Sequence, residues 1–410
     1  MNVSPSVSPP IGLMRPYFLF SGFFYLLSMF TLLFLDPQTT FQDFSLIAWV
    51  HLYMLGFVMM TIFAAMAQLG PIVVETAHYN VTIFKYLWIF LISGLLLILY
   101  GFLNNVTYLL TGGTFVLIAI IIYSVEFLLT LKNSQRKTSI TIAMKMSNFF
   151  LLTGIITGLV MASSFSGLLR INPQDILHIH TFGLIVGFVI LLIMGISIIL
   201  IPMFGSSKRI SDNEFKNSFY TLSLGTITMM LSPFFYTYYL QSIAYTITVL
   251  AILLYFYQLY KMTSSRARVK HDIWARSMYL AFISFILSFF FLISYLFSDN
   301  ETLLRIGMWL IFIGFFGSII LGNFYKILPF LIWFHIYSPL IEKQVVPMLH
   351  QLLPVKLANL QWFYSLSGLL LTTIALYAQN TQLFIGGVIL LATASLIFFI
   401  IIIKLLKLKI

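Results

Sequence analysis

The sequence predicts an all-α integral membrane protein with twelve transmembrane helices in three pseudo-repeated units of four. Three observations predict this fold. The chain of 410 residues is 60% hydrophobic and only 8% charged, whereas soluble domains carry roughly 25% charged residues. Its apolar residues gather into runs of about 20, the length that a helix needs to cross a bilayer. Finally, one pattern of Gly, Phe and Pro recurs in three of these runs.

Polar breaks divide the chain into twelve apolar runs within a single membrane domain, residues 1–410. We expect the four-helix units to cover residues 12–135, 140–262 and 272–405 approximately. The tenth run can break at Pro329, and residues 330–360 are expected to form a large inner loop with an interfacial segment. The runs, in order, are 17–35, 45–68, 84–104, 108–131, 146–168, 176–202, 217–238, 240–260, 275–297, 302–328, 362–379 and 382–403.

The basic residues predict how the helices are oriented. Lys and Arg concentrate in the cytoplasmic loops of membrane proteins. With twelve helices and a cytoplasmic N-terminus, all but two of the 22 basic residues lie on the cytoplasmic side, the exceptions being Arg170 and Arg305. Both termini are therefore expected in the cytoplasm. The net charge of +11 is explained by this topology, so we expect the lipid bilayer as a partner and no nucleic acid.

An internal repeat supports the grouping into three units. Three segments align without gaps, and in each a Gly-Phe pair precedes a proline by the same interval. A small residue follows each glycine at a fixed position, and small residues allow helices to approach closely. The segments begin at Gly56, Gly187 and Gly314, contain Ala64, Gly195 and Gly322, and end at Pro71, Pro202 and Pro329.

Several classes of site are excluded or disfavoured by what the sequence lacks. There is no cysteine, which excludes disulfides, iron–sulfur clusters, thiolate zinc sites and c-type haem attachment. No Walker A loop and no His-Glu-x-x-His motif occurs, which argues against an ATP-driven pump and a zinc protease of that type. We expect no cleavable signal peptide, because residues 1–15 lack a basic segment followed by an apolar one.

The seven histidines fall into two groups. For His78, His271, His335 and His350, in loops or near the interface, we expect solvated or interfacial structural roles. His51, His178 and His180 instead lie among apolar residues in the outer parts of the second and sixth runs. An imidazole there is costly unless it is paired or ligated.

These three outer histidines are candidate ligands of haem iron or copper. Counted back from the repeat prolines, they lie within about 6 Å of one another in depth. At 100° per residue, His51 and His178 share one helix stripe, and His180 points almost oppositely. The alternative is a set of structural hydrogen bonds between helices. Glu126, near the inner end of the fourth run, is a candidate proton or cation site, or it extends to the interface.

The chain resembles subunit I of the haem–copper oxidase superfamily, which includes the nitric oxide reductases. The segment His178-Ile179-His180 resembles the family's His-x-His pair, and His51 resembles its low-spin haem ligand. Residues Arg15-Pro16-Tyr17-Phe18, and His51 through Gly56-Phe57, are also similar to the NnrS group of twelve-helix membrane proteins. The resemblance assigns His51 and His180 to one haem, whereas the stripe argument pairs His51 with His178. Both pairings stay open.

The resemblance implies a haem cofactor of b type, with copper as a further candidate. It also implies an electron-donor protein or quinol as partner, and a location in the cytoplasmic membrane of a prokaryote. Electron transfer, nitric oxide handling, and metal or haem supply are the implied functions. Oxidoreductase activity is left open, because the chain has no adjacent His-His pair and the tenth run has no histidine before Pro329.

Two other functions are compatible with the sequence. The first is a transporter in which the histidines and Glu126 form a substrate or proton site. The second is a membrane assembly factor without chemistry of its own, which would dock a partner through residues 330–360.

Overall fold

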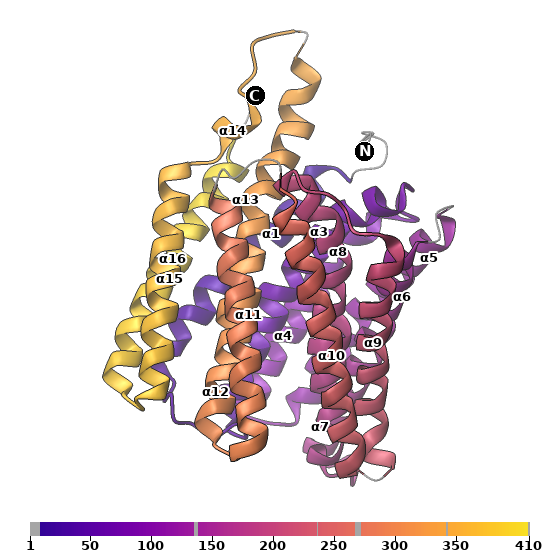
Figure 1. The fold of residues 1–410 in the computed structure, drawn as a ribbon, viewed down its shortest axis with the longest axis vertical. Coiled ribbons are helices and arrows are strands. Elements are labelled where there is room, and N and C mark those ends of the chain that lie inside the picture. Colours follow the sequence, from indigo (N-terminus) through magenta and orange to yellow (C-terminus); the bar gives the residue numbers. More distant parts are fainter. Residues whose placement is uncertain (1–8, 135–137, 236, 267–271, 342, 409–410) are drawn as a thin grey trace. The chain divides into compact units, whose positions relative to one another are not determined.

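Every regular element that the structure describes is a helix (Figure 1). The computed structural model describes residues 9–134, 138–235, 237–266, 272–341 and 343–408. The described chain divides into two compact units, which we call the terminal unit (residues 9–67 and 270–410) and the central unit (residues 68–269). Helix α3 contributes residues to both.

The terminal unit contains the first two predicted spans and the last four. Its helices are α1 (Ile11–Thr31), η1 (Leu32–Phe34), α2 (Phe44–His51), η2 (Leu52–Met59), the first part of α3 (Met60–Val74), α11 (Ile273–Ser298), α12 (Glu301–Trp309), η6 (Leu310–Gly317), α13 (Ser318–Ile332), η7 (Trp333–Tyr337), η8 (Ser338–Leu340), α14 (Leu349–Leu352), α15 (Val355–Tyr377) and α16 (Thr381–Leu406).

The central unit contains the third to the eighth predicted spans. Its helices are η3 (Val81–Lys85), α4 (Leu87–Leu103), α5 (Tyr108–Asn133), α6 (Ser139–Phe165), α7 (Pro173–Phe182), η4 (Gly183–Ile190), α8 (Leu191–Gly205), α9 (Asp212–Leu231), η5 (Ser232–Phe234) and α10 (Thr237–Ser264).

The prediction of a multi-pass helical membrane protein is confirmed. Among the described residues, nine helical segments are long and apolar enough to cross a membrane. The other three predicted spans overlap α4, α9 and α15. Helix α4 has only 17 residues, while α9 and α15 carry polar residues along much of their length. These three exceptions are the third helix of each predicted four-helix unit.

The internal repeat coincides with an unusual backbone structure. Segments η2, η4 and η6 are π-helices of eight residues each, and each begins four residues before the repeat glycine, Gly56, Gly187 or Gly314. Each is followed by an α-helix of 15 residues that contains the repeat proline three residues before its end. π-helices are rare and concentrate at functional sites, and here their boundaries match at the three segments that align in the sequence.

The third repeat differs from the other two at its end. Glu75 and Ser206, at equivalent positions directly after α3 and α8, adopt a left-handed conformation with φ of 52° and 51°, and the helices stop there. The predicted break at Pro329 is wrong, because α13 continues beyond that proline into η7 and η8. A proline three residues before a helix end removes only one backbone donor. The segment from α13 to η7 extends past α15 and α16 (Figure 1).

Close glycine contacts hold the remaining helices together as antiparallel pairs, α4 with α5, α9 with α10, and α15 with α16. A Cβ on Gly94 would lie 2.8 Å from the carbonyl oxygen of Gly112, and one on Gly368 would lie 2.9 Å from that of Gly387. A Cβ on Gly225 would likewise lie 2.7 Å from Oγ1 of Thr248. The backbones therefore touch where a larger side chain would separate them.

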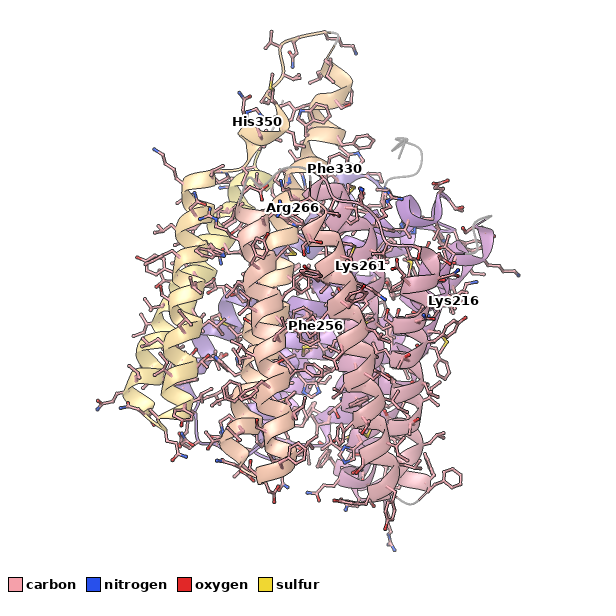
Figure 2. All side chains as sticks on the ribbon, viewed as in Figure 1. Lys216, Phe256, Lys261, Arg266, Phe330 and His350 are labelled. Carbon is pink, nitrogen blue, oxygen red and sulfur yellow. The ribbon has the colours of Figure 1, made fainter. Side chains whose placement is uncertain are left out.

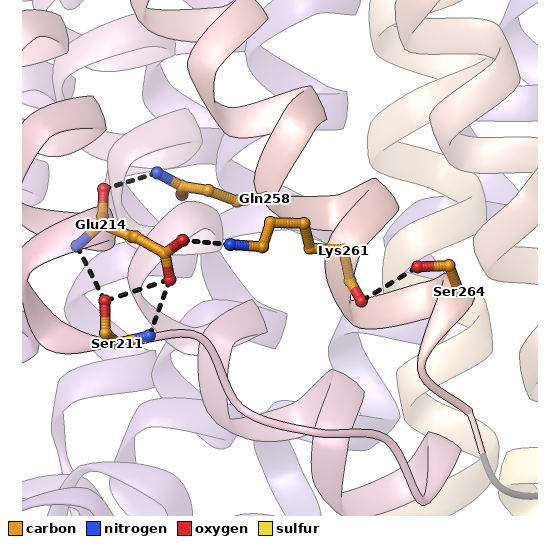
Figure 3. Close-up of polar contacts among 5 residues, drawn as sticks. All are labelled: Ser211, Glu214, Gln258, Lys261 and Ser264. Atoms are coloured by element: carbon orange, nitrogen blue, oxygen red, sulfur yellow. Dashed lines mark hydrogen bonds and ion pairs between the residues drawn. The ribbon is translucent and has the colours of Figure 1, made fainter.

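Polar contacts join α9 and α10 at one end of their pair (Figure 3). Ser211 caps α9 through a capping box with Glu214, and Glu214 also forms an ion pair with Lys261. The amide of Gln258 donates to the carbonyl oxygen of Glu214 at 2.6 Å. Lys261 and Lys216 lie toward this end, and Phe256 lies nearer the middle of α10 (Figure 2).

Candidate functional site

The outer histidines lie on short helices that lead into the π-helices. Helices α2, α7 and α12 are each capped by the side chain of the residue before them, which accepts a hydrogen bond from a backbone N–H of the first turn. The capping residues are Asp43, Asn172 and Asn300 respectively. Such caps fix the first turn of a helix. Each of these helices ends at the residue before the π-helix, so the cap and the π-helix together define the position of the histidines.

His51 is the last residue of α2, and its side chain is half-buried. Its Nδ1 atom lies 2.8 Å from the carbonyl oxygen of Ile47, one helical turn earlier. Because a carbonyl oxygen can only accept a hydrogen bond, Nδ1 carries the proton, and the lone pair of the ring is on Nε2. Phe182 and Trp309 occupy the equivalent positions before η4 and η6.

Aromatic rings in the terminal unit pack beside the helix that carries His51. The rings of Trp49 and Tyr53 stack with centroids 5.6 Å apart, and Trp49 also stacks on Trp309 at 6.3 Å. The hydroxyl of Tyr53 donates to the carbonyl oxygen of Phe312 at 2.7 Å. These contacts hold α2 and η2 firmly against α12 and η6.

His180, on α7 of the central unit, is anchored to the neighbouring helix α6. Its Nδ1 atom lies 2.8 Å from the carbonyl oxygen of Gly154. The ring covers Gly158, where a Cβ would lie 2.7 Å from Cε1 and 2.8 Å from Nδ1 of the imidazole. Gly154 and Gly158 are one turn apart on the same face of α6. The two glycines thus make room for the ring, and its hydrogen bond places the proton on Nδ1, as in His51.

His178 lies two residues before His180 and is turned to the other side of α7, because successive residues are 100° apart. Its side chain is half-buried, and it makes no hydrogen bond within the described part of the chain. The structure therefore anchors His180 but not His178. The pairing of either residue with His51 stays a prediction, since His51 belongs to the other compact unit.

Direct metal binding by three protein side chains is not found in the described residues. No group of three or more His, Cys, Asp or Glu side chains there could hold a metal ion. A haem iron needs only one or two imidazoles from the protein, so this finding concerns a directly held metal ion and not haem. It leaves copper without a set of three such ligands in the ranges that the structure describes.

A second polar site contains Glu126, which was a candidate from the sequence, and His78, which was not. Glu126 is buried, with 3% of its side chain exposed, and it does not extend to the interface. Its Oε1 atom lies 2.8 Å from Nδ1 of His78, whose side chain is 4% exposed. The solvated role expected for His78 is therefore wrong, because the loop after α3 folds this imidazole inward, while an interfacial structural role stays a prediction. The signal available in the sequence was Glu126 itself, because a carboxyl group within an apolar run needs a hydrogen-bonding partner.

His335 and His350 do not take part in these contacts. His335 lies half-buried in η7, and His350 is exposed in α14, at the end of the terminal unit that extends beyond α15 and α16 (Figure 2). His271 lies outside the described residues.

No protein-family model matches this sequence, and no curated protein matches it. The residues of the chain itself therefore carry the functional proposal.

Proposed function

We propose that this protein binds haem in the cytoplasmic membrane of a prokaryote. His51 of the terminal unit and His180 of the central unit are each a leading candidate to hold the iron. Its function would be electron transfer, nitric oxide handling, or haem and metal supply, as in the haem–copper oxidase and NnrS proteins that it resembles. The observation that carries the proposal is that His51 and His180 make the same kind of hydrogen bond. In each residue, Nδ1 lies 2.8 Å from a backbone carbonyl oxygen.

That hydrogen bond is characteristic of a metal-ligating histidine. Such a residue generally donates its second ring N–H to a carbonyl or carboxylate group, which fixes the tautomer and the ring orientation. In His51 and His180 the bond leaves Nε2 as the basic nitrogen. The glycine contact at Gly158 adds a second restraint on the ring of His180, as expected for a preorganised ligand.

Haem is favoured over copper by the available ligands. The chain has no cysteine, and the described residues contain no group of three ligands for a directly held metal. Bound haem would supply one-electron chemistry at its iron. The residues of the protein would hold the ring nitrogens in place, and the apolar helices would exclude water, which tunes the reduction potential. An electron-donor protein or quinol is then the expected partner.

We also propose the complete architecture of twelve helices in three units, with both termini in the cytoplasm. Two features support it: the matching boundaries of η2, η4 and η6, and the glycine-packed pairs of the third and fourth helices.

Purified full-length protein provides the test. We expect a Soret absorbance band and one or more haems per chain. His51→Ala should remove most of the bound haem, whereas His350→Ala, in an exposed segment, should leave it unchanged. A parent protein that lacks both haem and metal, or a His51→Ala variant with its full complement, would overturn the proposal in favour of a transporter. Comparing His178→Ala with His180→Ala decides which of the two is the second ligand.

A further inference from the structure

The buried pair of His78 and Glu126 has no role in the proposed haem site. Glu126 lies on α5, about two turns before the helix ends at Asn133. His78 belongs to the connection of residues 75–80 that follows α3. The two elements meet at the end of the central unit where Ser134 donates to the carbonyl oxygen of Val74 at 3.0 Å.

The hydrogen bonds around this pair all reach one oxygen of the carboxyl group. Oε1 of Glu126 accepts from Nδ1 of His78 at 2.8 Å, from the hydroxyl of Thr130 at 2.8 Å, and from the backbone N–H of Asn80 at 3.4 Å. The hydroxyl of Thr130 in turn accepts from the N–H of Tyr79 at 3.0 Å. The loop thus directs one imidazole and one backbone N–H at the carboxyl group, and a second backbone N–H at the hydroxyl of Thr130.

The second oxygen is left without a partner. Oε2 of Glu126 is buried and makes no hydrogen bond within the described part of the chain. A buried charged oxygen without donors is much more costly than a neutral one. A proton on Oε2 removes that charge, while Oε1 keeps all three donors. The alternative is a proton on His78, which gives a buried ion pair. Both charges then lose their contact with water, and Oε2 has no donor that would offset this cost.

The pair is also close to water and continuous with a polar stripe. Tyr79, the residue after His78, is 60% exposed, so this connection reaches the surface of the protein. On α5, Tyr123, Glu126 and Thr130 recur at helical spacing on one face, and Ser134 follows directly after the helix. Tyr123 and Thr130 are buried, and the stripe reaches about 15 Å from the end of the helix at 1.5 Å per residue.

Few other titratable groups face the carboxyl group. Besides His78, Tyr123 is the neighbour on α5 itself, and Glu75 belongs to the same connection as His78. Helix α6, which packs against α5, contributes Lys145, and η3, which packs against α4, contains Lys85. Neither lysine forms an ion pair with Glu126 in the part of the chain that the structure describes. His78 is accordingly the main group with which Glu126 can share a proton.

We infer that His78 and Glu126 form a binding site for one proton, separate from the haem site. Oε2 of Glu126 takes the proton from a hydronium ion on the side of the membrane where α5 ends, which forms an O–H bond, a neutral carboxylic acid and a water molecule. Release transfers the proton back to water. The stripe from Ser134 to Tyr123 places this site at the start of a polar path toward the middle of the bilayer.

Infrared difference spectra of the full-length protein in lipid nanodiscs test the inference directly. A pH step across the range in which the protein stays folded should change a carbonyl band of a protonated carboxylic acid. Incorporation of ¹³C-labelled glutamate should shift that band, and Glu126→Gln should abolish it. Glu301→Gln, which removes an exposed glutamate, should leave it unchanged.

Variants of the donors complete the experiment. Thr130→Val and His78→Gln should each keep the band but change its frequency, because Oε1 loses one donor. If Glu126→Gln does not fold, the ¹³C shift in the parent and the frequency change in Thr130→Val still identify the group. The absence of any glutamate carbonyl band in the parent over this pH range would overturn the inference and leave a permanently ionised structural pair. Haem content is not needed for any of these measurements.

Discussion

The Nδ1 atom of His180 lies 2.8 Å from the carbonyl oxygen of Gly154, and this bond joins a histidine of α7 to the backbone of α6. It fixes both the tautomer and the direction of the imidazole. Gly158, one turn further along α6, lies directly beneath the same ring. The position of His180 therefore depends on two glycines of another helix, which gives a test that leaves the histidine itself intact.

Gly158→Ala should weaken haem binding by about 10- to 100-fold, the usual cost of disturbing a residue that orients a metal ligand. The new methyl group would lie 2.7 Å from Cε1 of His180, so the ring must move. Gly195→Ala is the matched control, because its nearest neighbours are at 3.9 Å. The measurement is haem bound per chain during titration. Equal affinities of the two variants would contradict a ligand role for His180.

The repeat glycines of the π-helices should be intolerant of a side chain. A Cβ on Gly187 would lie 2.7 Å from Cγ of Phe150, and one on Gly314 would lie 2.5 Å from Cβ of Ser284. Overpacking of this kind costs about 1–3 kcal/mol. We expect Gly187→Ala and Gly314→Ala each to lower the thermal unfolding temperature in detergent. Gly386→Ala, with its nearest atom at 3.7 Å, should not. Unchanged unfolding temperatures in all three would show that η4 and η6 pack loosely.

The helical class and the repeat register could be predicted from the sequence because both depend on composition and local spacing. The π-helices could not, since an α-helix and a π-helix differ in hydrogen-bond register and not in the residue types they require. Gly56, Gly187 and Gly314 marked their centres without revealing their type. The break expected at Pro329 failed because no residue in the left-handed conformation follows α13, unlike Glu75 after α3 and Ser206 after α8.

Contacts between distant parts of the sequence were the hardest to predict. His78 and Glu126 are 48 residues apart, and no periodicity connects a loop histidine to a helical carboxyl group. The contact of His180 with α6 had a visible signal in Gly154 and Gly158, whose spacing is typical of close helix packing. Which side chain fills the space over such glycines depends on how the neighbouring helix is rotated, and that follows from the whole packing arrangement.

The charge pattern makes a prediction about topology. A reporter that is active only in the cytoplasm should be active when fused after residue 270 and inactive when fused near residue 299. Helix α11 separates the two positions, and the basic residues concentrate before it. Both fusions are compared for expression level by immunoblot. The reverse activity at either position would contradict the twelve-helix orientation with a cytoplasmic N-terminus.

The ion pair between Glu214 and Lys261 makes a prediction about pH. The hydrogen bond from the Lys261 ammonium group, with further donors from Ser211, lowers the pKa of Glu214 from 4.5 to about 2. A carboxyl group whose pKa is lowered by folding stabilises the protein above its unfolded pKa. The contribution is therefore complete at neutral pH and is lost as the pH falls from about 4.5 toward about 2. Because Glu214 is 37% exposed, it should be below about 1 kcal/mol.

Glu214→Gln isolates this ion pair, because glutamine at the same position preserves a capping box with Ser211. At pH 7 the variant should unfold at a slightly lower temperature than the parent, and the difference should shrink as the pH falls from about 4.5 and vanish below about 2. Lys261→Met removes the other partner and should give the same pH dependence, with no further loss in the double variant. A difference between parent and Glu214→Gln that persists unchanged into acid would show that the side chain acts through α9 capping, and that the ion pair joining α9 to α10 contributes nothing.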